Sequence, residues 1–362
     1  MHATARSLRA VFLGTKYIPN ASKKERGEHM NAFRWRTVFL SCAHFAVDFS
    51  CAFLLYRRFA ANAQIATVIL LYNFFAFAVQ LPLGILADQL GRPERFAALG
   101  CLLCGAAYAL PSAIIAAVVA GIGNALFHVG GGCEVMDASP EHAAPLGVFV
   151  SPGAFGIYFG MLLGKNGGLP FLLLPVLMAA LGILCLFSGA RIQRDNDVAF
   201  PVNIGEGFCV LAIFVVVLLR SYGGFAMAFP WRTGILAFAA VAATVLGKTV
   251  GGFLSDQVGL RWGGVISLLG AGVLFLFSAH PVSGLLGIFL FNLTMPMTLF
   301  ALAKRLPTHR GACFGLLTFA LFLGFLPKYF GLPAPLSTGA LLMSVSLGSL
   351  LVYFPAAERR ET

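Results

Sequence analysis

The chain of 362 residues is 59% apolar and only 11% charged, whereas a soluble globular domain carries about 25% charged residues. The mean hydropathy of +0.87 leaves too few polar groups to cover a water-exposed surface. The formal net charge of +11 does not indicate nucleic-acid binding, because the basic residues lie at the ends of apolar segments instead of clustering on one surface.

The first segment, residues 1–33, is polar and basic, and its longest apolar stretch is too short for a signal-peptide core. We expect it to form a cytoplasmic tail. Met30 immediately precedes the first long apolar run, so both Met1 and Met30 are candidate start sites.

Long apolar runs follow along the chain, and we interpret them as transmembrane helices, because about 20 apolar residues span a hydrocarbon core of about 30 Å. An N-terminal half over 34–190 contains predicted spans at 36–56, 63–87, 95–111, 113–133, 144–163 and 169–190. A polar linker over 191–206 follows. The C-terminal half over 207–355 contains predicted spans at 207–229, 233–254, 262–279, 282–303, 311–330 and 335–354, and 356–362 is a second tail. The sequence therefore predicts an all-α, polytopic membrane protein with twelve transmembrane helices.

Basic residues are distributed unevenly between alternate loops. The N-terminal tail and every second loop hold most of the Lys and Arg residues, whereas the other loops hold only Arg57, Arg58, Lys165, Arg232 and Lys328. Positive charge stays on the cytoplasmic side of a bilayer. We therefore predict a multi-pass protein of the cytoplasmic membrane with both termini in the cytoplasm.

A short sequence recurs in both halves. Residues 84–91 read GILADQLG, and residues 252–259 read GFLSDQVG. Both copies end the second predicted span of their half and enter the following loop. This repeat predicts two pseudo-symmetric six-helix halves, as in secondary transporters built from parallel repeats.

The first copy, with Asp88, Gly91 and Arg92, resembles the signature loop between the second and third spans of the major facilitator superfamily. The second copy matches less closely, because Leu260 stands where the pattern has Arg. The resemblance covers the chain after residue 33 and implies a secondary transporter that works by alternating access.

Within that superfamily, the fourth predicted span is similar to drug efflux proteins of the fosmidomycin-resistance type. The similar residues are Gly121, Gly123, Ala125, Phe127 and His128, and the chain departs from that group at the next position, where Val replaces Pro. This resemblance implies an antiporter that exports a drug-like solute.

The residue types of the repeated loop suit a latch that gates one side of the membrane. Gly84 lets another helix approach closely, Gly91 permits a left-handed turn, and Asp88 can accept hydrogen bonds from a facing helix N-terminus. The alternative is a short turn with arginines that reach the headgroups. The candidate gating residues are Gly84, Asp88, Gly91, Arg92, Gly252, Asp256 and Gly259.

Ionisable residues inside the predicted spans are candidate substrate or coupling residues, because burying charge in a bilayer is costly. Asp48 lies near mid-depth of the first span, and His44, one turn earlier, shares its helical face. Together they could accept a proton, since the ordinary pKa of histidine lies near neutrality; a structural hydrogen-bonded pair is the alternative. His128 is a further candidate in the fourth span, whereas we expect Glu134 and Asp137, at the end of that span, to face water.

Arg220 in the seventh span and Lys248 in the eighth are the basic candidates. A guanidinium keeps its charge, so Arg220 needs a carboxylate partner or an anionic ligand. Because the first and seventh spans would occupy equivalent places in the two halves, we expect Asp48 and Arg220 to face each other across a central cavity. Lys248 could instead extend toward the membrane surface.

The predicted function is proton-coupled transport of a small organic solute with an anionic or zwitterionic group, by a monomer. The sequence lacks an ATP-binding phosphate loop. It also lacks a recognisable enzyme motif, and the cysteines, which lie in or at the ends of apolar segments, are expected to be structural, so we expect no enzymatic activity, cofactor or bound metal. The alternatives are a non-transporting sensor or scaffold with a carrier fold and, less favoured, a membrane-embedded enzyme that uses His44, Asp48 and His128.

Overall fold

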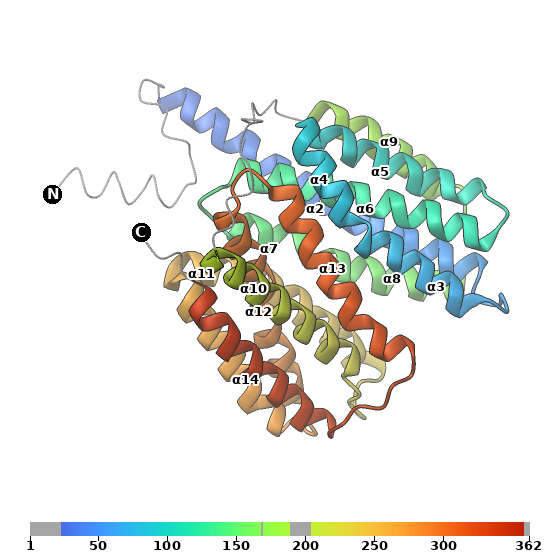
Figure 1. Ribbon diagram of the computed structural model, residues 1–362. Helices are drawn as coiled ribbons and strands as arrows, with labels where there is room; N and C mark the ends of the chain where they lie inside the picture. Colours follow the sequence, from blue (N-terminus) through green and yellow to red (C-terminus); the bar gives the residue numbers. More distant parts are fainter. Residues whose placement is uncertain (1–22, 168, 189–203, 358–362) are drawn as a thin grey trace.

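The computed structural model describes residues 23–167, 169–188 and 204–357, and all regular secondary structure in these ranges is helical (Figure 1). Most of the predicted linker and much of both predicted tails lie outside the described residues. Within the predicted N-terminal tail, the helix that forms the first span already begins at Lys23.

The helices gather in two groups, which follow each other along the chain (Figure 1). The first group contains α2 (Lys23–Arg58), α3 (Ile65–Asn73), the π-helix η1 (Phe74–Ala78), α4 (Gln80–Leu90), α5 (Pro93–Ala106), the short 3-10 helix η2 (Ala107–Ala109), α6 (Ala113–Ala138), α7 (Ala144–Val150), α8 (Gly153–Asn166) and α9 (Leu173–Ser188). The second contains α10 (Ile204–Ala226), α11 (Gly234–Leu276), α12 (Pro281–Arg305), α13 (Arg310–Tyr329) and α14 (Thr338–Ala356).

Many of these helices have the length and composition of membrane spans. Among the described residues, nine continuous helical stretches are long and apolar enough to cross a bilayer; Ile65–Leu90 joins α3, η1 and α4, and Ala144–Asn166 joins α7 and α8. A shorter apolar helix, Leu173–Phe187, lies in α9. Large apolar side chains point outward as lipid-facing residues do, for example Val176 and Phe187 on α9. The predicted all-α, polytopic membrane protein is confirmed.

Helix packing within the first group depends on small residues. Gly156, Gly160 and Gly164 recur every four residues on α8 and are buried, and α8 packs along α2. Such a stripe lets two helix backbones approach closely, which is how helices associate in a membrane. This close contact sets the position of α2, which carries two of the candidate site residues.

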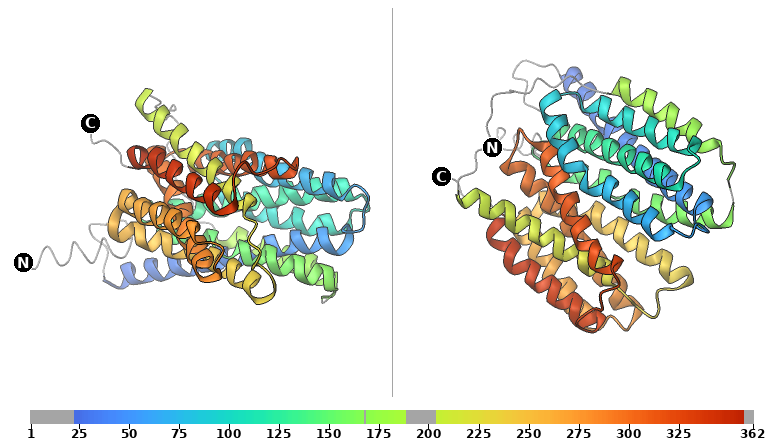
Figure 2. Two further views of the ribbon diagram at one scale, coloured as in Figure 1. Left: turned by 90° about the horizontal axis from the view of Figure 1, so that it is seen from below. Right: turned by 45° about the vertical axis from the view of Figure 1, so that its right-hand side comes forward.

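Two helix pairs join the groups. α13 of the second group packs against α4 of the first, and α11 of the second packs against α7 of the first. Figures 1 and 2 show α13 running beside the first group along one side of the molecule. Both pairs bring a copy of the repeated loop against the beginning of a helix in the other group.

Candidate functional site

Three ionisable side chains meet between α2 and α6. His44 and Asp48 lie one turn apart on α2, and His44 Nε2 is 3.2 Å from Asp48 Oδ2. His128 on α6 places its Nε2 2.8 Å from His44 Nε2 and 3.7 Å from Asp48 Oδ1. We refer to these three residues as the His–Asp–His cluster.

Hydrogen bonds from the surrounding helices fix the orientation of both rings. His44 Nδ1 lies 2.7 Å from the carbonyl oxygen of Phe149, and His128 Nδ1 lies 2.8 Å from that of Asn124. The Asn124 side chain also donates to Asp48 Oδ1 at 2.8 Å. Because a carbonyl oxygen only accepts hydrogen bonds, each Nδ1 must carry a proton.

The orientation of the rings has an electrostatic consequence. With Nδ1 protonated in both rings, a neutral His44 and a neutral His128 would direct their Nε2 lone pairs at each other and toward the Asp48 carboxylate. Three acceptors this close repel one another unless a cation lies among them. A proton shared between the two Nε2 atoms is the simplest such cation.

The backbone of α8 closes the cluster on one side. Gly153 is its first residue, and a Cβ atom added there would overlap Asp48 Oδ2 and His44 Nε2, nearer than real Cβ atoms approach. A glycine is therefore required for Asp48 Oδ2 and His44 Nε2 to lie against this helix. Asn124 was not among the residues predicted from the sequence, although it stands one helical turn before His128.

Two basic side chains lie on the other group of helices. Arg220 on α10 is buried, donates from Nη2 to the Phe291 carbonyl oxygen at 2.8 Å and places its guanidinium over the Phe291 ring at 5.0 Å. Its buried Nε has no hydrogen-bond partner. Lys248 on α11 has Nζ 3.5 Å from the Val150 carbonyl oxygen and lies within electrostatic reach of both Asp48 and Arg220.

Asp48 and Arg220, which we expected to face each other across a cavity, form no ion pair with each other. Asp48 is occupied by His44 and Asn124 in its own helix group, and Arg220 contacts Phe291 in its own group. Among the described residues, neither Arg220 nor Lys248 forms an ion pair with a carboxylate. The His–Asp–His cluster and Arg220 thus make these contacts in separate helix groups, and Lys248 interacts electrostatically with both Asp48 and Arg220.

The repeated loops form two matching contacts at one end of the molecule. Asp88 Oδ1 and Oδ2 accept hydrogen bonds from the backbone N–H groups of Gly311 (2.9 Å) and Ala312 (2.8 Å), at the start of α13. Asp256 accepts from the backbone N–H groups of two residues at the start of α7, Ala143 at 2.7 Å and Ala144 at 3.0 Å. A carboxylate at a helix N-terminus is stabilised by the unpaired N–H groups and by the helix dipole. We refer to the two contacts as the latches.

Glycines allow the two backbones at each latch to approach closely. A Cβ atom at Gly84 would overlap the Gly311 carbonyl group, and one at Gly252 would overlap that of Ala143. Gly91 ends α4 in the left-handed conformation, with φ of 62° and ψ of 26°, as predicted. Gly259 also has a positive φ, 82°, but an extended ψ of 159° that interrupts α11.

Two ion pairs join the C-terminal part of α6 to other helices. Arg310 Nη1 lies 2.6 Å from Asp137 Oδ1, and Arg36 pairs with Glu134, whose side chain is fully buried. The expectation that Glu134 and Asp137 face water is therefore wrong, because each meets an arginine from a distant part of the chain. Arg92, by contrast, is 40% exposed and lies 3.9 Å from Glu94.

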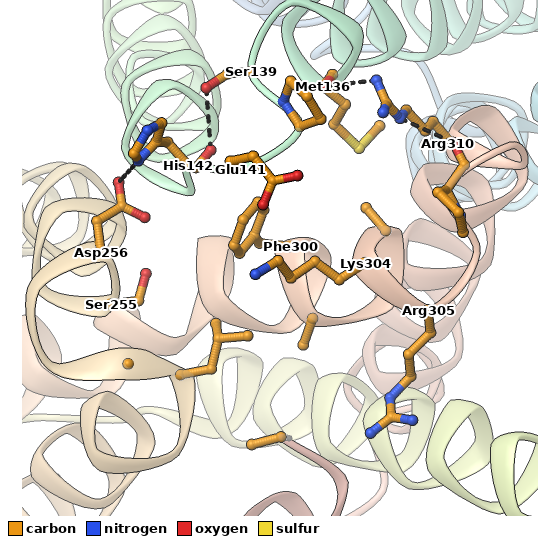
Figure 3. A pocket seen from close by; sticks show the side chains of 17 residues that line it. Met136, Ser139, Glu141, His142, Ser255, Asp256, Phe300, Lys304, Arg305 and Arg310 are labelled. Atoms are coloured by element: carbon orange, nitrogen blue, oxygen red, sulfur yellow. Dashed lines mark hydrogen bonds and ion pairs between the residues drawn. The ribbon is translucent and has the colours of Figure 1, made fainter. Parts of the chain in front are cut away.

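A cavity of about 970 Å³ lies at the latch end, between the two helix groups. Figure 3 shows Glu141, from the connection between α6 and α7, and Lys304, from α12, extending into it, with the His142–Asp256 pair at its edge. The cavity is lined by charged groups of both signs, and none of the three residues of the His–Asp–His cluster lines it.

Neutralising both latches should open this end of the molecule. In the double variant Asp88→Asn with Asp256→Asn, an amide N–H₂ group would replace one acceptor and face a backbone N–H donor. We expect the distance between spin labels at positions 141 and 304, on opposite walls of the cavity, to lengthen in double electron–electron resonance. Glu94→Gln, at the same end, should leave that distance unchanged. The same distance in the double variant and the wild type would contradict a latch function.

The chain is thus a polytopic helical membrane protein with a buried His–Asp–His cluster and two latches. No protein-family model and no curated protein matches its sequence. Solved structures do match its fold. One is a structure of the E. coli fucose:proton symporter FucP, with a TM-score of 0.64 and 14% identity over 89% of this chain and 97% of that chain. Another is FucP described as a major facilitator superfamily transporter in the outward conformation, with a TM-score of 0.62, 14% identity and 88% and 97% coverage. The chain therefore has the fold of major facilitator superfamily transporters.

Proposed function

We propose that this protein is a secondary active transporter of the major facilitator type, which moves a small organic solute by alternating access and couples that movement to protons. The observation that carries the proposal is the His–Asp–His cluster, which is buried between membrane-spanning helices and in which three acceptor atoms require a shared cation. Ionisable groups at such depth are costly and are retained for function.

We further propose that the chain crosses the membrane twelve times, in two pseudo-symmetric halves. The 43 residues of α11 would extend about 65 Å as one helix, roughly twice a hydrocarbon core, and Gly259 interrupts it. If α11 crosses the membrane twice, the nine long stretches make ten crossings, and α5 and α9 bring the number to twelve. The latches support the symmetry, because each connects a repeated loop of one half to the start of a helix in the other.

The latch end is assigned to the cytoplasm. Arg92, Lys304, Arg305 and Arg310 lie at this end, as does the first part of α2, and positively charged residues are retained on the cytoplasmic side. Both termini then lie in the cytoplasm. The latches are closed in this structure, so this conformation would present its solute site to the outside.

Proton coupling is proposed to occur at Asp48, with His44 and His128. The cluster can hold one positive charge between its acceptors, and its loss would leave them repelling one another. A structure with this fold is described as a fucose:proton symporter, which supports a proton as the coupling ion. Export by antiport, as in the fosmidomycin-resistance type, is supported here by the motif that contains Gly121, Gly123 and His128.

An anionic or zwitterionic solute fits the two cations that have no carboxylate partner among the described residues. The buried Nε of Arg220 has no hydrogen-bond partner, and Lys248 lies within electrostatic reach of both Arg220 and Asp48. A carboxylate or similar group could accept hydrogen bonds from the guanidinium, which suits planar oxyanions. The solute would thereby engage α10 and α11 while the proton occupies α2 and α6.

Counterflow in liposomes that contain only this protein tests the function. Vesicles loaded with an unlabelled solute from a panel of organic acids, amino acids and sugars are diluted into a trace of the labelled solute. A carrier should accumulate the label transiently, and the solute should be recovered chemically unchanged. No counterflow with any solute would favour a sensor or scaffold, and conversion to a new compound would indicate an enzyme. Protein-free liposomes are the control.

A further inference from the structure

The His–Asp–His cluster also has the ligand set of a transition-metal site. We propose that His44 Nε2, His128 Nε2 and one oxygen of Asp48 bind a single divalent transition-metal ion of the Zn²⁺, Co²⁺ or Ni²⁺ kind. This inference concerns binding alone and does not depend on the solute that the protein carries.

The spacing of the three atoms suits such an ion. The ligand atoms all lie within 4.8 Å of one another. The two Nε2 atoms are 2.8 Å apart, His44 Nε2 is 3.2 Å from Asp48 Oδ2, and His128 Nε2 is 3.7 Å from the other carboxylate oxygen, Oδ1. Two ligands at about 2.1 Å from a zinc ion are about 3.0 Å apart at a right angle and about 3.4 Å apart in a tetrahedron. Small side-chain rotations would therefore bring all three atoms to bonding distance.

The outer contacts are those that metal-binding histidines use. A histidine that binds a metal through one nitrogen usually donates its other N–H to a carbonyl or carboxylate, which fixes its orientation. His44 and His128 both do so, toward the carbonyl oxygens of Phe149 and Asn124. The Asn124 amide holds the carboxylate of Asp48 in the same way. Both Nε2 lone pairs are thus oriented inward before any ion arrives.

The chemistry of the ligands limits which ions fit. Two imidazoles and one carboxylate suit Zn²⁺, Co²⁺, Ni²⁺ or Cu²⁺, whereas Mg²⁺ and Ca²⁺ prefer oxygen ligands. Three protein ligands leave a fourth position for water or another small ligand. A bound ion would replace the shared proton and relieve the same repulsion among the three acceptors. The His128 side chain is 12% exposed, so one edge of the cluster is accessible.

Isothermal titration calorimetry of the purified protein, without a polyhistidine tag, measures binding directly. We expect one Zn²⁺ per chain in the wild type, and affinity lower by about 100-fold or more in His44→Ala and His128→Ala, since even outer-shell changes cost about 10- to 100-fold. His280→Ala alters an exposed histidine and His142→Ala alters a second His–Asp pair; both should bind as the wild type does. No binding, or binding that the cluster variants leave unchanged, would overturn the proposal.

X-ray absorption of the Zn²⁺-loaded wild type provides a second test that requires no variant to fold. We expect a first shell of nitrogen and oxygen only, with the scattering pattern of two imidazoles. The competing ligands are buried thiols, such as Cys51 and Cys104, whose sulfur atoms are 3.6 Å apart. Sulfur in the first shell would place the ion there and overturn the assignment.

Discussion

Asp48→Asn is expected to reduce pH-driven accumulation of the solute to the level of protein-free liposomes, while counterflow of the same solute continues. The asparagine has nearly the same shape as aspartate, but its amide can donate a hydrogen bond toward His44 and carries no charge. The three-acceptor arrangement that requires a shared cation is then lost. Solute exchange, which involves no net proton movement, remains possible. Accumulation under an imposed pH gradient and counterflow, measured on one liposome preparation, separate the two effects.

A matched control for Asp48→Asn removes a carboxylate elsewhere. Glu141 is exposed in the latch-end cavity, and Glu141→Gln should accumulate solute as the wild type does. If Asp48→Asn accumulates solute to the wild-type level with the same pH dependence, Asp48 does not couple transport to protons, and the structural hydrogen-bonded pair becomes the better interpretation.

Arg220→Ala is expected to raise the KM for an anionic solute by about 10- to 100-fold, because a hydrogen bond to a charged group contributes about 1.5–3 kcal/mol. Arg220→Lys should retain part of the affinity, since it keeps the charge but loses the planar pair of donors. Initial rates of uptake over a range of solute concentrations give the KM of each variant. A neutral solute from the same panel, if transported, should be affected much less.

Two comparisons make the Arg220 result interpretable. Arg232, in the connection between α10 and α11, is exposed, and Arg232→Ala should leave the KM unchanged. If Arg220→Ala lowers transport of anionic and neutral solutes equally and also lowers the thermal stability of the protein, then Arg220 serves the packing of α10 on α12 through Phe291, and the anion site is wrong.

The latches were predictable in detail because they depend on local sequence. A glycine, an aspartate and a second glycine at fixed spacing end α4, and the sequence repeats them at Gly252, Asp256 and Gly259. The prediction that Asp88 binds the N-terminus of a facing helix is confirmed by its two hydrogen bonds to α13. The identity of that helix was not predictable, because Asp88 and Gly311 are far apart in the chain.

The His–Asp–His cluster was predictable only in part. The pairing of His44 with Asp48 follows from their spacing of one helical turn. The contact with His128 depends on the height and rotation of α6 relative to α2, which the sequence spacing does not give. The unknown relative placement of the helices also explains two wrong expectations. Glu134 is buried against Arg36, 98 residues earlier, and Arg220 turns toward Phe291 and not toward Asp48. An expected equivalence of the first and seventh spans does not fix where their side chains point.

Solute-driven proton movement tests the proposed carrier most directly. Liposomes that contain this protein and a pH-sensitive dye are mixed with each solute of the panel, and the internal pH is followed. We expect at least one anionic or zwitterionic solute to change the internal pH with the wild type and not with Asp48→Asn. Entry of a solute without any pH change, at the same rate in both proteins, would contradict proton coupling through the His–Asp–His cluster.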